Sequence, residues 1–349
     1  MKGLLTLVGT LLVLPAQAAD PFEELLKRRE TAFARLDETA QDALSTAQRR
    51  ADELYEEALR SSRTRFIGYR DAGATRVQVR YDSGEVVIET VTPDAVEAAT
   101  RVLDTLEDLT KSEGEKALPA LGDLLAPTVA PEPESDPGQR RQRLAADLKA
   151  EPPKVGIPGK RWVLTVPMVA DHLQRRARRY LPLIREAAAR WKIEPALVLA
   201  VIHTESLFNP DAVSSSGALG LMQIMPQYAG KEVLETRGHS GSVSRKTWFE
   251  PHFNIEVGTC YLALLSGQRH YFADVPLPET RRLLVVGGYN WGPHRVLQRV
   301  LTPIPRGGLG PAETHRRLAR FAPAETRAYV RDVEQRREQW GRWLEEGTG

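Results

Sequence analysis

Apolar residues recur every three or four positions between Phe22 and Leu59, with charged residues between them. This spacing predicts a long amphipathic helix with an alanine-rich apolar stripe. The pattern then changes to alternation of apolar and polar residues in residues 76–81 and again in residues 85–91. Two alternating runs joined by a short turn that contains Gly84 predict a β-hairpin.

A helix is expected to follow the hairpin, with Thr92 as its N-cap and Pro93 at its first helical position. Residues 19–116 would then form a small α+β N-terminal domain. Between residues 117 and 160 the composition changes, because eight of the chain's 24 prolines lie there among charged residues. Such a segment buries little apolar surface, and we interpret it as a semi-extended linker.

Residues 161–349 have the pattern of a mainly helical domain. A short strand is expected at residues 162–166, and helices are expected at residues 169–192, 195–206, 254–269, 280–287 and 326–346. The predicted fold class is therefore α+β overall, with a mainly α C-terminal domain after the small α+β domain.

The first 18 residues have the three parts of a secretory signal peptide. Lys2 supplies the positive charge, residues 3–14 are apolar, and Ala16-Gln17-Ala18 form a small-residue cleavage site. The apolar run is too short to span a bilayer, and no other segment is apolar enough to do so. Since no cysteine lies near the cleavage site to accept a lipid, we expect a soluble periplasmic protein.

Composition argues against several classes of function. The formal net charge is only +2 for 349 residues, so no strong field favours a nucleic-acid partner. The one cysteine, Cys260, lies in an apolar helical segment, and we expect a buried, unreactive thiol there. No His-Glu-x-x-His pattern is present, and neither a metal nor another cofactor is expected.

Glu205 is the strongest candidate for chemistry. It lies at the C-terminal end of residues 195–206, a predicted helix so apolar that neighbours should cover it on nearly all sides. Loss of water and the negative end of the helix dipole both disfavour the charged carboxylate, so they raise its pKa. A carboxyl group that keeps its proton near neutral pH can act as a general acid in glycoside cleavage.

The loop after this helix is rich in small polar residues. Asn209-Pro210 breaks the helix, and Ser214-Ser215-Ser216 offers hydroxyl groups. Gly217 and Gly220 permit close approach of the backbone to a ligand or to another helix. The side chain of Gln223 has both donors and acceptors, which suit the amides and hydroxyls of a sugar.

Four motifs in the same order resemble those of the family 1 lytic transglycosylases, which have a lysozyme-like domain of the soluble-lytic-transglycosylase (SLT) type. They are Glu205-Ser206, Gly220-Leu221-Met222-Gln223-Ile224-Met225-Pro226, Gly288-Tyr289-Asn290, and Glu325-Thr326 with Tyr329. The resemblance covers about residues 180–329. The hairpin and the approach to residue 180 are similar, more loosely, to the membrane-bound lytic murein transglycosylase C type with its N-terminal domain.

The resemblance implies a role for each matching residue. Glu205 would be the only catalytic acid and base. The substrate-binding residues would be Ser206, Ser214, Ser216, Met222, Gln223, Tyr289, Asn290 and Tyr329. Gly288 stands where the family has alanine, Trp291-Gly292-Pro293 is unusual at its position, and the lipid-anchor cysteine of the C type is missing.

A site with one carboxyl group favours substrate assistance over the two-carboxylate scheme of most glycosidases. Glu205 would protonate the glycosidic bond between N-acetylmuramic acid and N-acetylglucosamine in peptidoglycan, and the 2-acetamido group would stabilise the positive charge. The same glutamate would then take the proton of the 6-hydroxyl, which closes on C1 to give a 1,6-anhydro end. Asp211 is a weaker candidate for a second catalytic group, and His203 is interpreted as structural.

Two other functions remain open at this point. One is a goose-type lysozyme that hydrolyses the same bond, and the other is a non-catalytic peptidoglycan-binding protein. The intact Glu205, Gln223 and Tyr289 argue against the second. Peptidoglycan glycan strands are the expected partner, and the N-terminal domain would be the contact surface for further proteins of the cell envelope.

Overall fold

The structure is a computed structural model. It describes residues 46, 49–55, 59–111, 119–126, 137–151, 157–239, 241–267, 271–302 and 309–347. The predicted signal peptide lies outside these residues. Of the long helix predicted between Phe22 and Leu59, the structure describes residues 46 and 49–54, which are helical.

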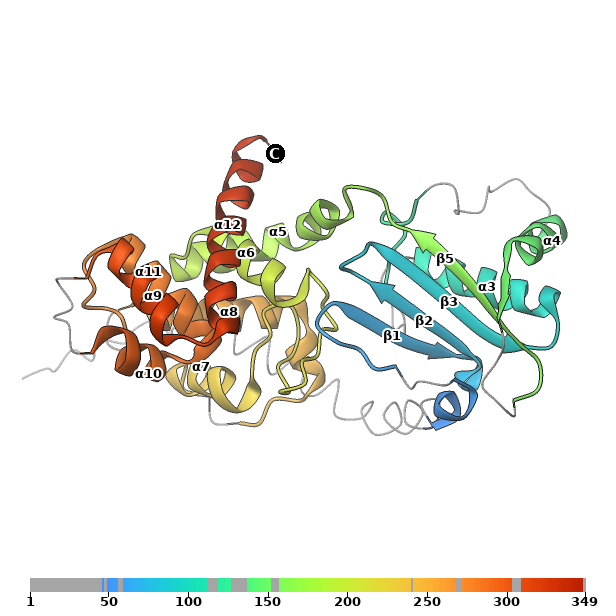
Figure 1. Ribbon diagram of the computed structural model, residues 1–349, viewed down its shortest axis with the longest axis horizontal. Coiled ribbons are helices and arrows are strands. Elements are labelled where there is room, and N and C mark those ends of the chain that lie inside the picture. Colours follow the sequence, from blue (N-terminus) through green and yellow to red (C-terminus); the bar gives the residue numbers. More distant parts are fainter. Residues whose placement is uncertain are drawn as a thin grey trace, which may run out of the picture.

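Five antiparallel strands form one sheet in the order β1-β2-β3-β5-β4 (Figure 1). The strands are β1 (Arg65–Arg70), β2 (Thr75–Arg80), β3 (Glu85–Thr92), β4 (Lys149–Glu151) and β5 (Lys160–Pro167). The predicted hairpin is confirmed as β2 and β3, which pair directly. β1 was not predicted.

One face of the sheet is apolar and packs against α3 (Ala95–Thr110), with α4 (Pro137–Asp147) beside that helix (Figure 1). The side chains that form this core include Val77, Val79, Val86, Ile88, Val102 and Leu106. In β2 these residues alternate with polar ones, whereas the other face of β3 carries Val87 and Val91 as well as Glu89, so that face of the sheet is polar only in part.

The predicted start of α3 was wrong. Asp94, not Thr92, is its N-cap, since the Asp94 carboxylate accepts a hydrogen bond from the backbone N–H of Glu97 at 2.8 Å. Thr92 is still part of β3 and pairs with Lys160 of β5. Pairing with β5 keeps Thr92 extended, and the sequence pattern around it does not reveal that partner.

The strand predicted at residues 162–166 is confirmed as β5, and it pairs with β3. α4 and β4 lie within residues 117–160, which we interpreted as a linker. The sheet therefore takes strands from both sides of the predicted boundary at residue 161. The reason is that alternation along one strand predicts its faces but not the strand to which it bonds.

The C-terminal part of the chain is helical, and the predicted α+β fold class is confirmed. Its helices are α5 (His172–Trp191), α6 (Pro195–Ser206), α7 (Lys231–Thr236), α8 (Pro251–Ser266), α9 (Pro278–Trp291), α10 (Pro293–Val296), α11 (Pro311–Phe321) and α12 (Ala324–Glu345). Short helical turns of this part cover Pro226–Gly230, Lys246–Phe249 and Leu297–Leu301, and one more, Asp71–Gly73, lies between β1 and β2 of the sheet. All five predicted helices are present, whereas α7, α10 and α11 were not predicted.

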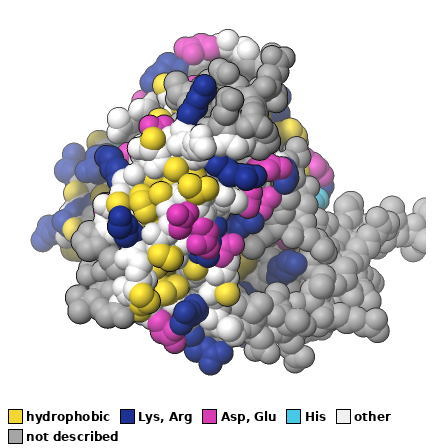
Figure 2. Space-filling model, turned by 90° about the vertical axis from the view of Figure 1, so that its right-hand side faces the viewer, with side chains coloured by type: hydrophobic (Ala, Val, Ile, Leu, Met, Phe, Trp, Pro, Cys, Tyr) yellow, Lys and Arg dark blue, Asp and Glu magenta, His cyan; other side chains and the backbone are white. Residues whose placement is uncertain are grey.

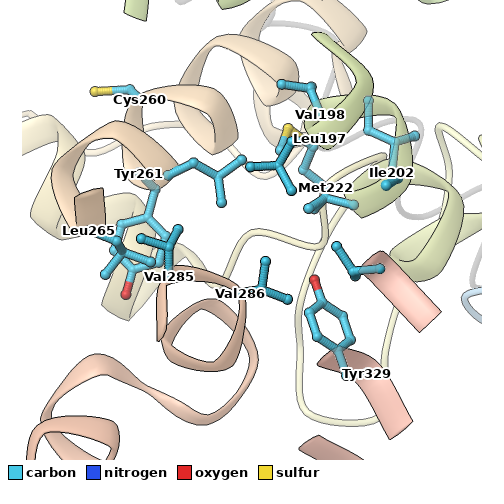
Figure 3. Close-up of a cluster of buried hydrophobic side chains, with 14 of the residues drawn as sticks. Leu197, Val198, Ile202, Met222, Cys260, Tyr261, Leu265, Val285, Val286 and Tyr329 are labelled. Atoms are coloured by element: carbon cyan, nitrogen blue, oxygen red, sulfur yellow. The ribbon is translucent and has the colours of Figure 1, made fainter. Parts of the chain in front are cut away.

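α6 runs through the core of the helical part. Residues 196–202 are each at most 6% exposed. Figure 3 shows Leu197, Val198 and Ile202 among side chains from other elements, such as Met222 and Val286. A helix that is apolar on all sides is stable only when neighbours cover it on all sides. Its burial therefore places the C-terminal end of α6, where Glu205 lies, inside the domain.

The sheet and the helical part contact each other closely. Arg176 of α5 is buried and donates a hydrogen bond to the backbone oxygen of Tyr81 at 3.1 Å. Gly84 has a φ of +69°, and a Cβ there would lie 2.7 Å from Nε2 of His172. Glycine is thus required both for this turn and for the approach of α5.

The surface at the sheet end of the molecule carries charges of both signs. Figure 2 shows Lys and Arg side chains interspersed with Asp and Glu and with hydrophobic side chains on the described part of this face. This mixture agrees with the small net charge and creates no field of one sign. None of the helices in the described ranges combines the length and the apolar character needed to cross a membrane.

A buried ionic cluster stabilises the polar face of the sheet. The Glu89 carboxylate accepts hydrogen bonds from Arg76 Nε at 2.7 Å, Gln78 Nε2 at 2.6 Å and Arg161 Nη1 at 2.9 Å. Burial opposes its ionisation, yet Arg76, Gln78 and Arg161 hold the pKa of Glu89 below its ordinary value. The stabilisation is therefore present at neutral pH and is lost as the pH falls through this lowered pKa.

We expect Glu89→Ala to lower the free energy of unfolding by about 3–5 kcal/mol, because it removes the carboxylate of a buried ion pair and leaves the Arg76 charge uncompensated by Glu89. Urea unfolding followed by circular dichroism measures the loss. Glu107→Ala, which removes an exposed pair with Lys111, is the matched control and should change it by no more than about 0.5 kcal/mol. Equal losses in both variants would show that the Glu89 cluster does not stabilise the sheet.

Candidate active site

The end of α6 fixes the position of Glu205. Pro195 begins the helix, and Leu207 and Phe208 end it in the left-handed conformation, with φ values of 53° and 59°. The backbone N–H of Leu207 caps the helix by donating to the oxygen of His203 at 3.2 Å. Glu205 therefore sits in the last turn and is only 8% exposed.

The surroundings of Glu205 favour its protonated form. Burial raises the pKa of this carboxyl group to about 7, and the nearby Glu325 carboxylate acts in the same direction. The Tyr329 hydroxyl and the Arg63 guanidinium oppose the rise by stabilising the charged carboxylate. The predicted rise in the pKa of Glu205, caused by burial, is confirmed.

Two tyrosines, the half-buried Tyr289 and the buried Tyr329, lie near the acid. Burial and the Glu205 carboxylate raise the pKa of Tyr289 and of Tyr329 well above the ordinary value, so both hydroxyls stay neutral donors. Tyr289 donates to the backbone oxygen of Met222 at 2.7 Å. The buried Tyr329 hydroxyl makes no well-aligned hydrogen bond among the described residues, which leaves it available to the Glu205 carboxylate. Figure 3 shows Tyr329 reaching from α12 into the core.

Glu205 opens into a groove made of two adjoining cavities. The cavity at the acid has a volume of about 470 Å³, and its walls include Arg63, Ser214, Ser216 and Glu325. The second cavity, of about 570 Å³, has five aromatic side chains in its lining: Tyr228, Tyr261, Tyr271, Tyr289 and Trp291. Gln223, Met225, Tyr289 and Asn290 line both. A long groove with aromatic walls and a few polar groups suits a polymer of sugars.

Gln223 is held at the junction of the two cavities by its own loop. Its φ is 49°, and its Nε2 donates to the backbone oxygens of Ala212 at 3.1 Å and Gly220 at 2.9 Å. The Oε1 atom is buried and has no partner among the described residues. The amide thus presents an unused acceptor beside the groove, which an N–H or O–H of a ligand can satisfy.

Asn254 of α8 supports the loop from behind. Its side chain accepts a hydrogen bond from the backbone N–H of Met222 at 2.7 Å and donates to the oxygens of Leu219 and Trp248. Gly220 lies so near that a Cβ there would be 2.4 Å from Asn254 Nδ2, so glycine is required. This framework fixes the loop without using any of the groups that face the groove.

Six of the predicted site residues line the groove: Glu205, Ser214, Ser216, Gln223, Tyr289 and Asn290. Tyr329 lies behind the acid, buried, and acts on it without lining either cavity. The side chains of Ser206 and Met222 do not reach the groove, which corrects their expected substrate contact. Both are 0% exposed. Ser206 Oγ donates to the oxygen of Leu221 at 2.7 Å, and Met222 packs where Gly258 leaves room.

Sequence reasoning missed Arg63 and Glu325 as parts of the site. Glu325 stands in one of the motifs, next to Thr326, whose hydroxyl donates to Asn290 Oδ1 at 2.7 Å. That motif could have pointed to it. No sequence feature pointed to Arg63 as part of the site, since it lies 142 residues before Glu205 and outside every motif.

Neither secondary candidate takes part in the groove. Trp340 Nε1 donates to Nδ1 of the half-buried His203 at 3.3 Å, and burial lowers the pKa of His203 to about 3. His203 is therefore neutral and structural, which agrees with its interpretation from the sequence. Asp211 lines a different cavity, with Tyr81 and Arg176, where burial raises its pKa to about 6. Cys260 is buried, as expected.

The described part of the chain contains no group of three His, Cys, Asp or Glu side chains that could hold a metal ion.

A groove with a buried carboxyl group whose pKa is raised to about 7 has what a sugar-cleaving site of the general-acid type requires. Comparison with known proteins agrees. The family model described as "Transglycosylase SLT domain" matches residues 182–302. The membrane-bound lytic murein transglycosylase C of Serratia proteamaculans is 32% identical over 285 residues, which cover 76% of this chain and 79% of that protein.

The protein of the same name from Pectobacterium atrosepticum is 39% identical over 178 residues, which cover 49% of each chain. Among solved structures, an inactive mutant of the lytic transglycosylase Slt of Pseudomonas aeruginosa is 28% identical, with a TM-score of 0.41. That match covers 50% of this chain and 25% of the other. The chain belongs to the family 1 lytic transglycosylases, and the resemblance seen in the sequence is confirmed.

We expect Tyr329→Phe to raise the pKa of Glu205 above its value of about 7, because the hydroxyl that stabilises the charged carboxylate is gone. A titration of glutamate side chains by carbon-13 nuclear magnetic resonance, with Glu205→Gln to assign the signal, measures this. Tyr69→Phe, which removes a hydroxyl bonded to Leu59 far from the groove, should leave the titration unchanged. An unchanged or lowered pKa in Tyr329→Phe would contradict the assigned contact.

Proposed function

We propose that this protein is a peptidoglycan lytic transglycosylase. It cleaves the β-1,4 bond between N-acetylmuramic acid and N-acetylglucosamine and leaves a 1,6-anhydro end, which makes it a carbon–oxygen lyase. The observation that carries the proposal is Glu205, whose buried carboxyl group has a pKa of about 7 and opens into the groove. At neutral pH a large fraction of the molecules carries a proton on such a group. After the group has donated this proton, it can accept another one.

The reaction uses this one group twice. Protonated Glu205 donates to the glycosidic oxygen as the C–O bond breaks, and the substrate's acetamido group stabilises the positive charge at C1. The carboxylate formed then takes the proton of the 6-hydroxyl, and that oxygen closes on C1. Because the hydroxyl belongs to the same sugar, its effective concentration exceeds that of a competing water.

The neighbours of Glu205 support these two steps. The Tyr329 hydroxyl and Arg63 stabilise the carboxylate after it has given up its proton. Gln223 Oε1 offers an acceptor, and the Asn290 amide stands beside it at the junction of the two cavities. We assign these amides to the hydroxyls and N-acetyl groups of the sugars. Ser214 and Ser216 line the cavity at the acid and offer further hydroxyls there.

Hydrolysis is a second candidate because Glu325 lines the same cavity. A second carboxylate could act as a base that activates water, as in an inverting glycosidase. Glu325 is exposed, however, at the rim of the cavity. We therefore assign it an electrostatic effect on Glu205, whose pKa it raises, and not a role in proton transfer.

The periplasm is the proposed location, since peptidoglycan lies there and the first 18 residues have a signal-peptide pattern. The relatives are named as membrane-bound. The N-terminal sheet is the proposed contact surface for other envelope proteins.

Glu205→Gln is expected to reduce the release of muropeptides from purified sacculi by at least about 10³-fold, because an amide cannot donate the proton that the leaving oxygen needs. The control for the loss of a carboxylate is Glu334→Gln on α12, which removes the charge that pairs with Arg282 of α9 and should keep the activity. Unchanged release by Glu205→Gln would refute a catalytic function.

The products distinguish the two reactions. Mass spectrometry should find ends that lack one water, as in a 1,6-anhydro sugar, whereas reducing ends would identify a hydrolase. Activity should fall as the pH rises through about 7, because Glu205 then loses its proton.

Glu325→Gln gives an independent check. It should keep most of the activity and move the alkaline limb of the pH profile to lower pH, because a negative neighbour of Glu205 is removed. Loss of activity as large as in Glu205→Gln would favour the hydrolase with Glu325 as base.

A further inference from the structure

Arg63 reaches the active site from the N-terminal part of the chain. It stands just before β1, and its guanidinium binds the last turn of α6. Its Nε donates to the backbone oxygen of Glu205 at 3.1 Å, and its Nη2 donates to the backbone oxygen of Thr204 at 3.1 Å. The same side chain lines the cavity into which Glu205 opens.

These hydrogen bonds satisfy a need of the helix itself. The last carbonyl groups of an α-helix have no partner within the helix and carry the negative end of its dipole. The backbone N–H of Leu207 binds the oxygen of His203, and that of Asn209 binds the oxygen of Ser206 at 3.0 Å. The two carbonyls between them, of Thr204 and Glu205, take the donors of Arg63. A cation at this end of the helix is also favourable for the dipole.

The contact between the two parts of the chain is reciprocal. Asn209, which is 0% exposed, donates from Nδ2 to the backbone oxygens of Ser62 and Arg63, each at 3.4 Å. Leu207, directly after α6, packs against the core of the N-terminal sheet. The backbone that carries Arg63 is thus held by the loop that follows Glu205, so the position of the guanidinium is determined by both parts.

We propose that Arg63 is a positioning residue of the active site, through which the N-terminal part of the chain holds the last turn of α6 and the Glu205 carboxyl group in the groove. The proposal rests on the proposed function of Glu205. It means that the sheet is part of the active site and does not serve only as a contact surface.

A charge effect accompanies this positioning. Four groups face Glu205: Arg63 from the N-terminal part, Tyr289 from α9, and Glu325 and Tyr329 from α12. Arg63 is the only cation among these four groups. It therefore limits the rise in the pKa of Glu205 that burial and Glu325 produce. With Arg63 present, Glu205 can both release its proton and take the next one near neutral pH.

The test compares Arg63→Gln, Arg63→Lys and the wild type in the full chain. Release of muropeptides from purified sacculi is measured across a pH series, and the pKa of Glu205 is measured separately by carbon-13 nuclear magnetic resonance. Arg60→Gln is the matched control, since Arg60 is an exposed arginine three residues earlier that does not line the groove. Thermal melting shows that each variant is folded.

Arg63→Gln should lower the rate about tenfold or more, because a small displacement of a catalytic group has an effect of this size. The alkaline limb of the pH profile and the pKa of Glu205 should both move upward by about half a unit or more. Arg63→Lys keeps the charge but not the paired N–H donors, so it should restore the pH profile and only part of the rate. Arg60→Gln should match the wild type.

Arg63→Gln with the rate and pH profile of the wild type would overturn the proposal while leaving the function of Glu205 intact. A lowered melting temperature with an unchanged pKa of Glu205 would also overturn it, since Arg63 would then only stabilise the fold. If the wild type released no muropeptides, the proposed function would fail. The pKa measurement would still decide whether Arg63 acts on Glu205, because it needs no turnover.

Discussion

The removal of Glu205 from water is the constraint on which the rest of the site depends. A carboxyl group at the end of α6 is buried because the apolar residues before it must be covered on all sides by the core. The same burial that stabilises the domain therefore raises the pKa of Glu205 to about 7. The groups that partly offset the desolvation, Tyr329 and Arg63, come from segments far apart in the chain, and their balance makes one carboxyl group suitable both as acid and as base.

The buried end of α6 creates a second requirement, which is a partner for each terminal carbonyl group. The chain meets it with the loop after the helix and with Arg63 from the N-terminal part. The hydrogen bonds that satisfy the terminal carbonyl groups of α6 thus connect the sheet to this helix. The burial of Leu207 against the core of the sheet and the hydrogen bond from Arg176 to Tyr81 strengthen the same junction. Stability of the helix end and organisation of the groove depend on the same contacts.

Features with a local cause could be predicted well. The hairpin of β2 and β3 follows from alternation, and α6 follows from its apolar run between Pro195 and a helix-breaking loop. Features that depend on distant partners could not. The N-cap at Asp94 depends on how β5 holds Thr92, and β1 shows its role only through pairing with β2. Ser206 and Met222 belong to motifs of the site, yet their side chains are buried in the core and do not line the groove.

The sequence by itself determined the family, and it singled out Glu205 as the proposed acid and the loop after it as polar, because each of these follows from a short run of neighbouring residues. It also determined that Glu205 would be hard to ionise, since the apolar helix before it allows no other environment. Only the tertiary structure decided which groups face the acid, because Arg63, Tyr289 and Tyr329 approach it from three separate segments. Electrostatic effects act through space and not along the chain, so the final pKa of Glu205 is a property of the folded molecule.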